Sequence, residues 1–533
     1  MKPLLLYVAG CLLQTAAAGC NKNKQCEDDE FCYSTNSGGA CSDQNCACET
    51  CDGFGQPGFG SSDENCDRYE NRCSYACDGS DYPATAPAPT PRPQSAPTPQ
   101  SAPTPQSAPT PQSAPTPRPQ SAWKELVKLV ASDGASLSSS VAFDGDTVVA
   151  GSIGAGIGGA VYVFRASDGK QLATLTADDA AEGDWFGDSV AIDGGTVVVG
   201  ASSKDGDGGI WETGIGHVYV FRKDAWGTYD QVAKLKSSDA GRTSHAGADF
   251  GCSVAIDGST IVVGAYDHGG GFGYGAAYVF REGATGTYDE VAKLTPADGP
   301  SYDGASDGQW GHNFGYAVAI DGGTVVVAAR YDDDNGDYAG AVYVFRESAG
   351  TYAQVAKLTA ADGATWDVFG RSVAIDGGTI VVGAYGDDPG GSAYVLRTTD
   401  GGASYNQVAK LTAADAAAND WFGYSVAIDG STVVVGSLWD DDAGTNSGSA
   451  YVFRATDDGA TYDEVAKLTA ADAAAGDQFG SYVAITGDTV VIIGGGAAYV
   501  FEDESSWWDY FSSKAAKRPL PRVMVLLVAM LAL

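Results

Sequence analysis

One short segment recurs along the chain, and this repetition limits the possible folds more than any other feature. The segment Phe186–Gly194 has close copies beginning at Phe250, Phe314, Phe369, Phe422 and Phe479, and a degraded copy surrounds Val141–Gly145. The valine before the recurring alanine stands at positions 141, 190, 254, 318, 373, 426 and 483. Seven copies spaced by 49 to 64 residues predict a closed radial array or a solenoid.

Each copy contains four short apolar runs separated by glycine-rich or aspartate-rich turns. In order they read Ser-Val-Ala-Ile, Thr-Val-Val-Val-Gly, Ala-Tyr-Val-Phe-Arg and Val-Ala-Lys-Leu. Runs of four to six residues rich in Val, Ile, Tyr and Phe between Asp-Gly turns are typical of strands. Four antiparallel strands per repeat predict the blade of a propeller.

The two ends of the repeat region favour a closed ring. A fourth-strand run at Leu126–Leu129 precedes the first blade, and no such run follows Phe501. If Leu126–Leu129 pairs with Ala498–Phe501, the seventh blade is complete and no strand edge stays open. Residues 122–505 are therefore predicted to be an all-β, seven-bladed β-propeller.

The recurring Phe-Gly, the Val-Val-Val-Gly-Ala strand and the strand Gly340–Phe345 resemble the FG-GAP repeats of integrin alpha-chain propellers. The resemblance covers all seven repeats and implies extracellular adhesion or ligand binding through one face. In that family the turn between the first two strands often expands into a calcium loop. Here the turn is Asp193-Gly194-Gly195-Thr196, which is too short to surround a calcium ion.

Acidic residues cluster instead in the loops between the second and third strands, and a second set (Asp184, Asp249, Asp367, Asp420 and Asp477) precedes Phe-Gly. Both loops should emerge on one face, because successive strands run in opposite directions. Clustered carboxylates suit calcium, whereas aspartate is also common in turns and keeps proteins soluble. The candidate calcium ligands are Asp332, Asp333, Asp334, Asp337, Asp387, Asp388, Asp440, Asp441 and Asp442.

The two ends of the chain carry targeting signals. Residues 1–18 read as a secretory signal peptide, although Cys11 and Cys20 also lie in segments resembling lipoprotein sites. The tail, 506–533, ends in 11 apolar residues, Val523–Leu533, too few to span a bilayer. Its order resembles a glycosylphosphatidylinositol attachment signal with Ser513 as acceptor; the alternative is a frayed apolar tail. We expect an extracellular or cell-surface protein that meets a membrane only through this anchor.

Two further segments lie between the signal peptide and the repeats. Residues 19–82 hold an even number of cysteines, which predicts a small disulfide-rich module; a zinc site is the alternative. Residues 83–121 are rich in Pro, Ala, Thr, Ser and Gln and predict an extended linker. The cysteines of the module are Cys20, Cys26, Cys32, Cys41, Cys46, Cys48, Cys51, Cys66, Cys73 and Cys77.

The composition disfavours two functional classes, nucleic-acid binding and histidine-based catalysis. A net charge of −37 disfavours nucleic acid as a partner, and four histidines make a His-based catalytic centre hard to assemble. We therefore expect a non-enzymatic recognition protein whose propeller face binds a protein or a glycan, with calcium as its only candidate cofactor. The alternatives are a propeller-fold glycan-active enzyme and a structural component of a cell wall or coat. Candidate aromatic residues for sugar stacking are Trp211, Trp310, Trp366, Trp421 and Trp439.

Overall fold

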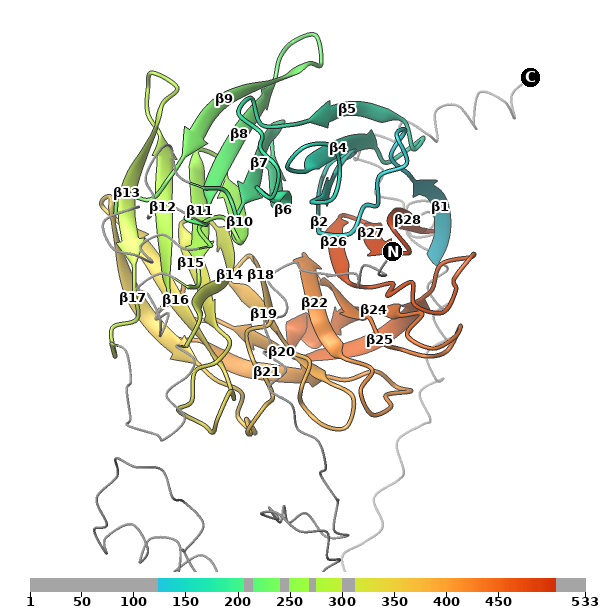
Figure 1. Cartoon of the computed structure of the whole chain (residues 1–533). Helices are drawn as coiled ribbons and strands as arrows, with labels where there is room; N and C mark the ends of the chain where they lie inside the picture. Colours follow the sequence, from blue (N-terminus) through green and yellow to red (C-terminus); the bar gives the residue numbers. More distant parts are fainter. Residues whose placement is uncertain (1–122, 206–213, 240–248, 268–274, 300–311, 505–533) are drawn as a thin grey trace, which may run out of the picture. The chain divides into compact units, whose positions relative to one another are not determined.

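The computed structural model describes residues 123–205, 214–239, 249–267, 275–299 and 312–504. Within these residues seven four-stranded antiparallel sheets surround a central axis (Figure 1). The predicted seven-bladed propeller is confirmed. The signal peptide, the cysteine module, the linker, Ser513, Trp211 and Trp310 lie outside the described residues, and no helix within them is long and apolar enough to cross a membrane.

The blades follow one another along the chain, each running from its innermost to its outermost strand. The first three consist of β2 (Ser140–Asp144), β3 (Thr147–Ser152), β4 (Ala160–Arg165) and β5 (Gln171–Leu175); β6 (Phe186–Asp193), β7 (Thr196–Ala201), β8 (His217–Lys223) and β9 (Tyr229–Leu235); and β10 (Ser253–Asp257), β11 (Thr260–Ala265), β12 (Ala276–Glu282) and β13 (Tyr288–Leu294). The next three consist of β14 (Phe314–Asp321), β15 (Thr324–Ala329), β16 (Ala341–Ser348) and β17 (Thr351–Leu358); β18 (Ser372–Asp376), β19 (Thr379–Ala384), β20 (Ser392–Arg397) and β21 (Asn406–Leu411); and β22 (Phe422–Asp429), β23 (Thr432–Ser437), β24 (Ser449–Thr456) and β25 (Thr461–Leu468), with a 3-10 turn η2 (Asp457–Gly459).

The seventh blade joins the two ends of the repeat region. It consists of β26 (Tyr482–Thr486), β27 (Thr489–Gly494), β28 (Ala497–Asp503) and, as its outer strand, β1 (Trp123–Leu129). In this pairing Leu129 lies opposite Ala498 and Trp123 lies opposite Asp503. The predicted closure of the ring by the N-terminal strand is therefore confirmed.

The burial of each strand follows its position in the blade. The second strand is apolar almost throughout and almost fully buried, as in β7, because neighbouring blades cover both of its faces. The outer strand alternates between exposed and covered residues, as in β13. The Phe of each Phe-Gly packs edge-on against aromatic residues of the third strand; Phe422, for example, lies 5.4 Å from Tyr451 and 5.9 Å from Phe453, centroid to centroid.

Adjacent blades touch through their backbones at each Phe-Gly. Gly391 forms a parallel bridge with Phe422 of the next blade, and the Phe422 N–H donates to the Gly390 carbonyl at 2.8 Å. A Cβ atom on Gly391 would lie 2.1 Å from the Phe422 carbonyl oxygen. The equivalent glycines in the other blades meet the same obstruction, and they are Gly159, Gly216, Gly275, Gly340 and Gly448.

A second ring of contacts joins the blades through the short Asp-Gly turns. The Asp193 carboxylate accepts a hydrogen bond from the Gly258 N–H of the next blade at 2.6 Å, and Asp376 accepts one from Gly430 at 2.5 Å. At the seam the Thr486 hydroxyl donates to the Phe143 carbonyl at 3.0 Å. The turn that is too short for calcium thus uses its carboxylate to hold the neighbouring blade.

Substitution of Gly391 by alanine should strongly destabilise the ring. The new methyl group would overlap the Phe422 carbonyl, and the backbone φ of +96° already disfavours a side chain. We expect a loss of roughly 2–4 kcal/mol in the free energy of unfolding, measured by denaturant titration. Gly183→Ala is the matched control, because Gly183 has φ +88° and no atom lies within 4 Å of the position that its Cβ would take; its loss should stay near 1 kcal/mol. Equal losses in the two variants would contradict the backbone contact.

Candidate ligand-binding face

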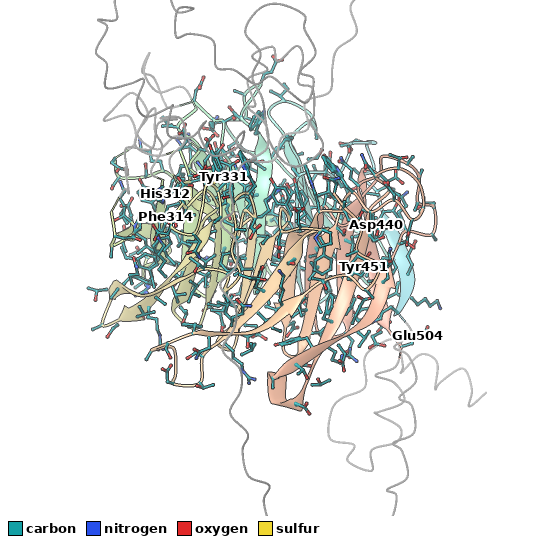
Figure 2. All side chains as sticks on the ribbon, turned by 90° about the horizontal axis from the view of Figure 1, so that it is seen from below. His312, Phe314, Tyr331, Asp440, Tyr451 and Glu504 are labelled. Atoms are coloured by element: carbon teal, nitrogen blue, oxygen red, sulfur yellow. The ribbon has the colours of Figure 1, made fainter. Side chains whose placement is uncertain are left out.

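Loops from the second and fourth strands of each blade emerge on one side of the propeller, here called the upper face. Figure 2 shows Tyr331, His312 and Asp440 towards this side and Glu504, just beyond β28, towards the other. Asp332 and Asp440 follow second strands, whereas Asp298 and Asp415 follow fourth strands, and the two kinds of residue meet in shared clusters. The expectation that both loop types share one face holds for these residues.

A tyrosine–aspartate hydrogen bond recurs in every blade at the upper face. The tyrosine belongs to the third strand, and the aspartate belongs to the loop that enters the blade. The hydroxyl-to-carboxylate distances range from 2.7 to 3.1 Å. The pairs are Tyr162–Asp133, Tyr219–Asp179, Tyr278–Asp239, Tyr343–Asp298, Tyr394–Asp362, Tyr451–Asp415 and Tyr499–Asp472.

In six blades a lysine of the outer strand reaches the same aspartate. The Nζ-to-carboxylate distances range from 2.6 to 2.9 Å, and the lysines are Lys128, Lys234, Lys293, Lys357, Lys410 and Lys467. In the first blade Thr174 takes this place opposite Tyr162. Sequence analysis missed these lysines, although five of them stand in the recurring Val-Ala-Lys-Leu run and Lys128 stands in its variant Leu-Val-Lys-Leu. The register that sets Lys467 opposite Tyr451 would have revealed the contact.

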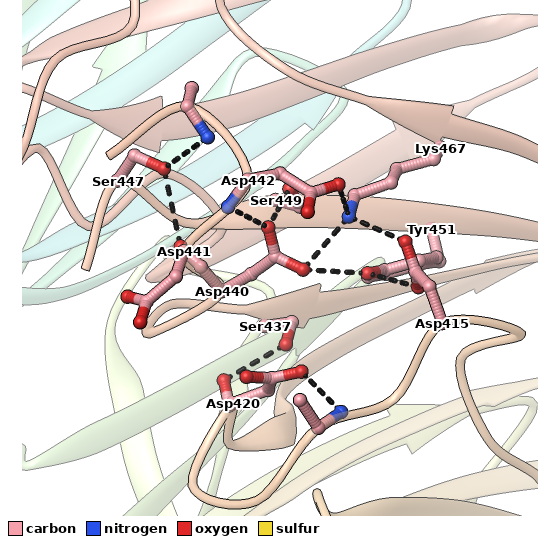
Figure 3. Close-up of polar contacts among 12 residues, drawn as sticks. Asp415, Asp420, Ser437, Asp440, Asp441, Asp442, Ser447, Ser449, Tyr451 and Lys467 are labelled. Carbon is pink, nitrogen blue, oxygen red and sulfur yellow. Dashed lines mark hydrogen bonds and ion pairs between the residues drawn. The ribbon is translucent and has the colours of Figure 1, made fainter. Parts of the chain in front are cut away.

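The predicted site around Asp440 is a carboxylate triad with a lysine at its centre (Figure 3). Carboxylate oxygens of Asp415, Asp440 and Asp442 lie within 4.8 Å of one another. The Lys467 ammonium lies 2.7 Å from Asp415 and 2.8 Å from Asp440 and also contacts Asp442. Burial alone would lower the pKa of Lys467, but hydrogen bonds to the three carboxylates raise it. The ammonium therefore stays charged and neutralises part of the triad.

The same arrangement recurs two blades earlier. Asp298, Asp332 and Asp334 form a triad, and the Lys357 ammonium lies 2.9 Å from Asp332. Burial would raise the pKa of Asp332, but hydrogen bonds from His312 and Lys357 hold it at about 2. Asp332 is therefore ionised at every physiological pH.

The other predicted ligands fall into two groups. Asp387 joins a smaller version of the cluster, where its carboxylate lies 2.6 Å from Lys410 and 2.7 Å from the Tyr394 hydroxyl. Asp333 and Asp441 instead accept backbone N–H bonds within their own loops, at 2.8 Å from Tyr338 and 2.6 Å from Asn446. Neither Asp337 nor Asp388 belongs to a described triad.

The triads suit a calcium ion in charge and in donor type, but each already surrounds an ammonium group. Calcium requires six or more oxygens, whereas each triad brings together one oxygen from each of its three carboxylates within 4.8 Å. An incoming ion would have to displace Lys357 or Lys467. Calcium binding at these residues stays a prediction.

The aspartates before Phe-Gly stabilise their own loops. The carboxylates of Asp184, Asp367, Asp420 and Asp477 each accept the N–H of the residue three positions earlier at 2.7 Å. Asp184 also receives the buried Lys204 ammonium at 2.7 Å. These four members of the acidic set therefore fit the turn-stabilising alternative.

The residue directly after Phe-Gly points to a site that sequence analysis did not identify. The repeat is nearly uniform around this position, yet the residue itself changes from copy to copy. It lines a cavity of about 230 Å³ on the propeller axis, together with residues of all seven innermost strands. The residues at this position in the cavity are Asp188, Cys252, Tyr316, Arg371, Tyr424 and Ser481. The variation of this one residue within an otherwise uniform repeat was the sequence signal that could have identified the cavity.

Two arginines lie among the tyrosines at the channel. The Arg371 guanidinium carbon lies 3.8 Å from the Tyr424 ring centroid and 5.4 Å from that of Tyr316. Arg330 lies 3.7 Å from the same Tyr316 ring, and its Nε donates to Asn313 at 3.3 Å. Such cation–π contacts hold a guanidinium by its face.

Further aromatic residues continue from the channel onto the upper face. Trp421 stacks on Trp439 with 3.4 Å between centroids and contacts Tyr385 at 4.9 Å. Trp366 stacks on Tyr338 at 4.2 Å and keeps 59% of its surface exposed. Among the described tryptophans considered for sugar stacking, Trp366 is thus the one whose ring is exposed to a ligand.

A buried carboxyl group lies in the same cavity as Arg371. Asp188 is 5% exposed, and its Oδ2 accepts a hydrogen bond from Ser202 at 2.5 Å. Burial raises the pKa of Asp188 to about 7. This carboxyl group changes its charge near neutral pH.

Replacement of Lys467 by methionine should destabilise the blade-six triad. Three carboxylates would lose their shared cation, and we expect a loss of roughly 1–3 kcal/mol in the free energy of unfolding. Millimolar calcium should raise the melting temperature of this variant more than that of the wild type, because the competing ammonium is gone. Lys124→Met is the control, since Lys124 forms an exposed pair with Glu504 at 3.5 Å. A variant that melts like the wild type with and without calcium would contradict this role.

Asp188 should make the protein less stable as the pH rises from about 4 to about 7. In this window the carboxyl is ionised in the unfolded chain but stays protonated in the folded one, whose pKa is about 7. The folded state then binds more protons, so stability falls with rising pH. Asp188→Asn should remove this contribution, changing the slope by up to about 1.4 kcal/mol per pH unit. Denaturant titrations at several pH values measure it, and identical slopes would refute the assignment.

A comparison with protein-family models agrees with the architecture. A family model described as FG-GAP repeat matches residues 123–164, 170–221, 229–280, 304–345, 352–396, 405–453 and 462–501. No curated protein matches the chain. Among solved structures, the computationally designed Ika8 protein is similar with 16% identity and a TM-score of 0.40, over 71% of this chain and 99% of that one. The seven matched repeats cover more than half of the sequence, and the chain belongs to the FG-GAP repeat family.

Proposed function

We propose that this protein is a non-enzymatic recognition protein of the cell surface or extracellular space. Its upper face would bind a protein or glycan ligand. The observation that carries this proposal is the concentration of arginine and aromatic side chains around the channel, at positions where the repeat itself varies. Membership of the FG-GAP family supports it.

The residues around the channel have the chemistry of a recognition surface. Tyrosine, tryptophan and arginine are the types that dominate binding energy in interfaces, because they combine large apolar area with polar groups. Trp366, Tyr338 and Tyr331 form one connected aromatic group, and Tyr331 also lies 4.4 Å from the Arg330 guanidinium. The group is anchored by packing, so little side-chain freedom is lost when a ligand binds.

Calcium assistance is a conditional part of the proposal. The two triads supply carboxylates beside the same face, and a ligand or an ion that displaces Lys357 or Lys467 would expose them. The calcium arm of the Lys467→Met experiment tests this part separately from ligand binding.

A glycan-active enzyme is the second candidate, because one observation favours it. Asp188, Arg371 and several tyrosines meet in the same cavity, and the Asp188 pKa of about 7 suits proton transfer near neutral pH. Release of reducing ends from a panel of acidic and neutral oligosaccharides, lost in Asp188→Asn, would favour the enzyme over the recognition protein.

Ligand binding should depend on the exposed tryptophan of the upper face. The full-length protein and Trp366→Ala would be applied to arrays of immobilised glycans and of extracellular proteins. We expect Trp366→Ala to weaken binding about fivefold or more, since loss of one stacked aromatic ring removes roughly 1–3 kcal/mol.

Trp226→Ala is the matched control. Trp226 is 92% exposed, but it lies in the turn between β8 and β9, on the opposite side of the propeller. Its replacement should leave binding unchanged. Equal weakening by both substitutions, or weakening by Trp226→Ala alone, would refute recognition through the upper face.

A further inference from the structure

We propose that the central channel binds the carboxylate of an acidic monosaccharide, with the Arg371 guanidinium as its principal ligand. This inference rests on the proposed recognition function and names a site and a ligand class for it. Three observations carry it: the unpaired donors of Arg371, the tyrosines that hold it, and the size and lining of the cavity.

The Arg371 guanidinium is buried with donors that the fold does not use. The residue is 7% exposed, and neither Nε nor Nη2 donates a hydrogen bond to any described residue. No described carboxylate forms an ion pair with it, although the chain has 68 acidic residues and 31 basic ones. A buried charge normally has a hydrogen-bonded partner, because its desolvation is otherwise unfavourable. The natural partner is an anion that enters the channel.

The tyrosines leave the donor edge of the guanidinium available. Tyr424 contacts its face at 3.8 Å, whereas the N–H groups lie in the plane of the guanidinium and point away from that contact. A planar fork held in one orientation matches the two oxygens of a carboxylate. Arg330, on the same Tyr316 ring, adds a second positive charge nearby. The channel is thus locally basic within an acidic protein.

The cavity has the size and lining of a site for one sugar ring. Its volume of about 230 Å³ lies below the roughly 300–1,000 Å³ of pockets for drug-sized ligands and is on the scale of one sugar ring. Tyr316, Tyr424 and Tyr482 are among its lining residues, and Asp188 contributes an Oδ1 that has no partner among the described residues. Aromatic faces and a few fixed polar groups are the usual means of binding a sugar.

The test is calorimetric titration of the full-length protein with D-glucuronate, using D-glucose as the neutral ligand of the same ring size. Acetate and inorganic phosphate are titrated in parallel. We expect saturable binding of glucuronate and none of glucose. Arg371→Gln should weaken glucuronate binding at least about tenfold. Arg371→Lys keeps the charge but loses the planar fork of donors, so its glucuronate affinity should lie between those of the wild type and Arg371→Gln.

Matched controls separate binding from folding. Arg165→Gln removes an exposed arginine of the β4 end, where it pairs with Asp168 at 2.9 Å, and should leave glucuronate affinity unchanged. Thermal unfolding of Arg371→Gln without ligand should match or exceed that of the wild type, because a buried unpaired charge is removed. If Arg371→Gln does not fold, the folded Arg371→Lys variant decides the question.

Several results would overturn the inference. These are no glucuronate binding by the wild type, equal affinity in the arginine variants, tighter binding of phosphate, or acetate binding as strong as that of glucuronate. If array ligands still bind and depend on Trp366, such a result refutes the channel site alone. If nothing binds at either place, the proposed function fails as well.

Discussion

The close approach of one blade's backbone to the Phe-Gly peptide of the next is the constraint on which the ring depends. At Gly391 and its equivalents no side chain fits, so the peptide bonds of neighbouring blades meet directly. The phenylalanine then fills the space beneath the contact, against two aromatic residues of the third strand. Because six of the seven junctions use this contact, the angle between blades is repeated. At the remaining junction, between the seventh and first blades, the Leu137 N–H donates to the Gly496 carbonyl instead.

Because the blades share this framework, the residue type can differ from blade to blade at only a few positions. The side chains of the blade core are fixed by packing. The aspartates of the Asp-Gly turns are fixed by hydrogen bonds to the next blade. The position after Phe-Gly faces the axis and is not tied to one residue type, and it holds aspartate, cysteine, tyrosine, arginine or serine in different blades. Tyrosine and arginine at neighbouring blades then create a chemical environment that no single repeat contains.

The sequence predicted the fold because the relevant signals are local and repeated. Alternating apolar runs mark the strands, and the extra run at Leu126–Leu129 identifies the partner of β28. The candidate site was predicted only in part. The acidic residues of the upper face were identified, but Lys467 reaches Asp440 through strand pairing and loop folding across 27 residues, which composition does not reveal. The role of Arg371 depends on which side chains point to the axis, and this requires the ring itself.

The seam in the seventh blade has a mechanical consequence. β1 begins at Trp123 directly beside Asp503, where β28 ends, so the chain enters and leaves the propeller at neighbouring points. Both points lie at the ends of strands on the side opposite the triads. A tether at either terminus would pull on the same edge of the same blade. Such a tether would attach on the side of the propeller opposite the triads.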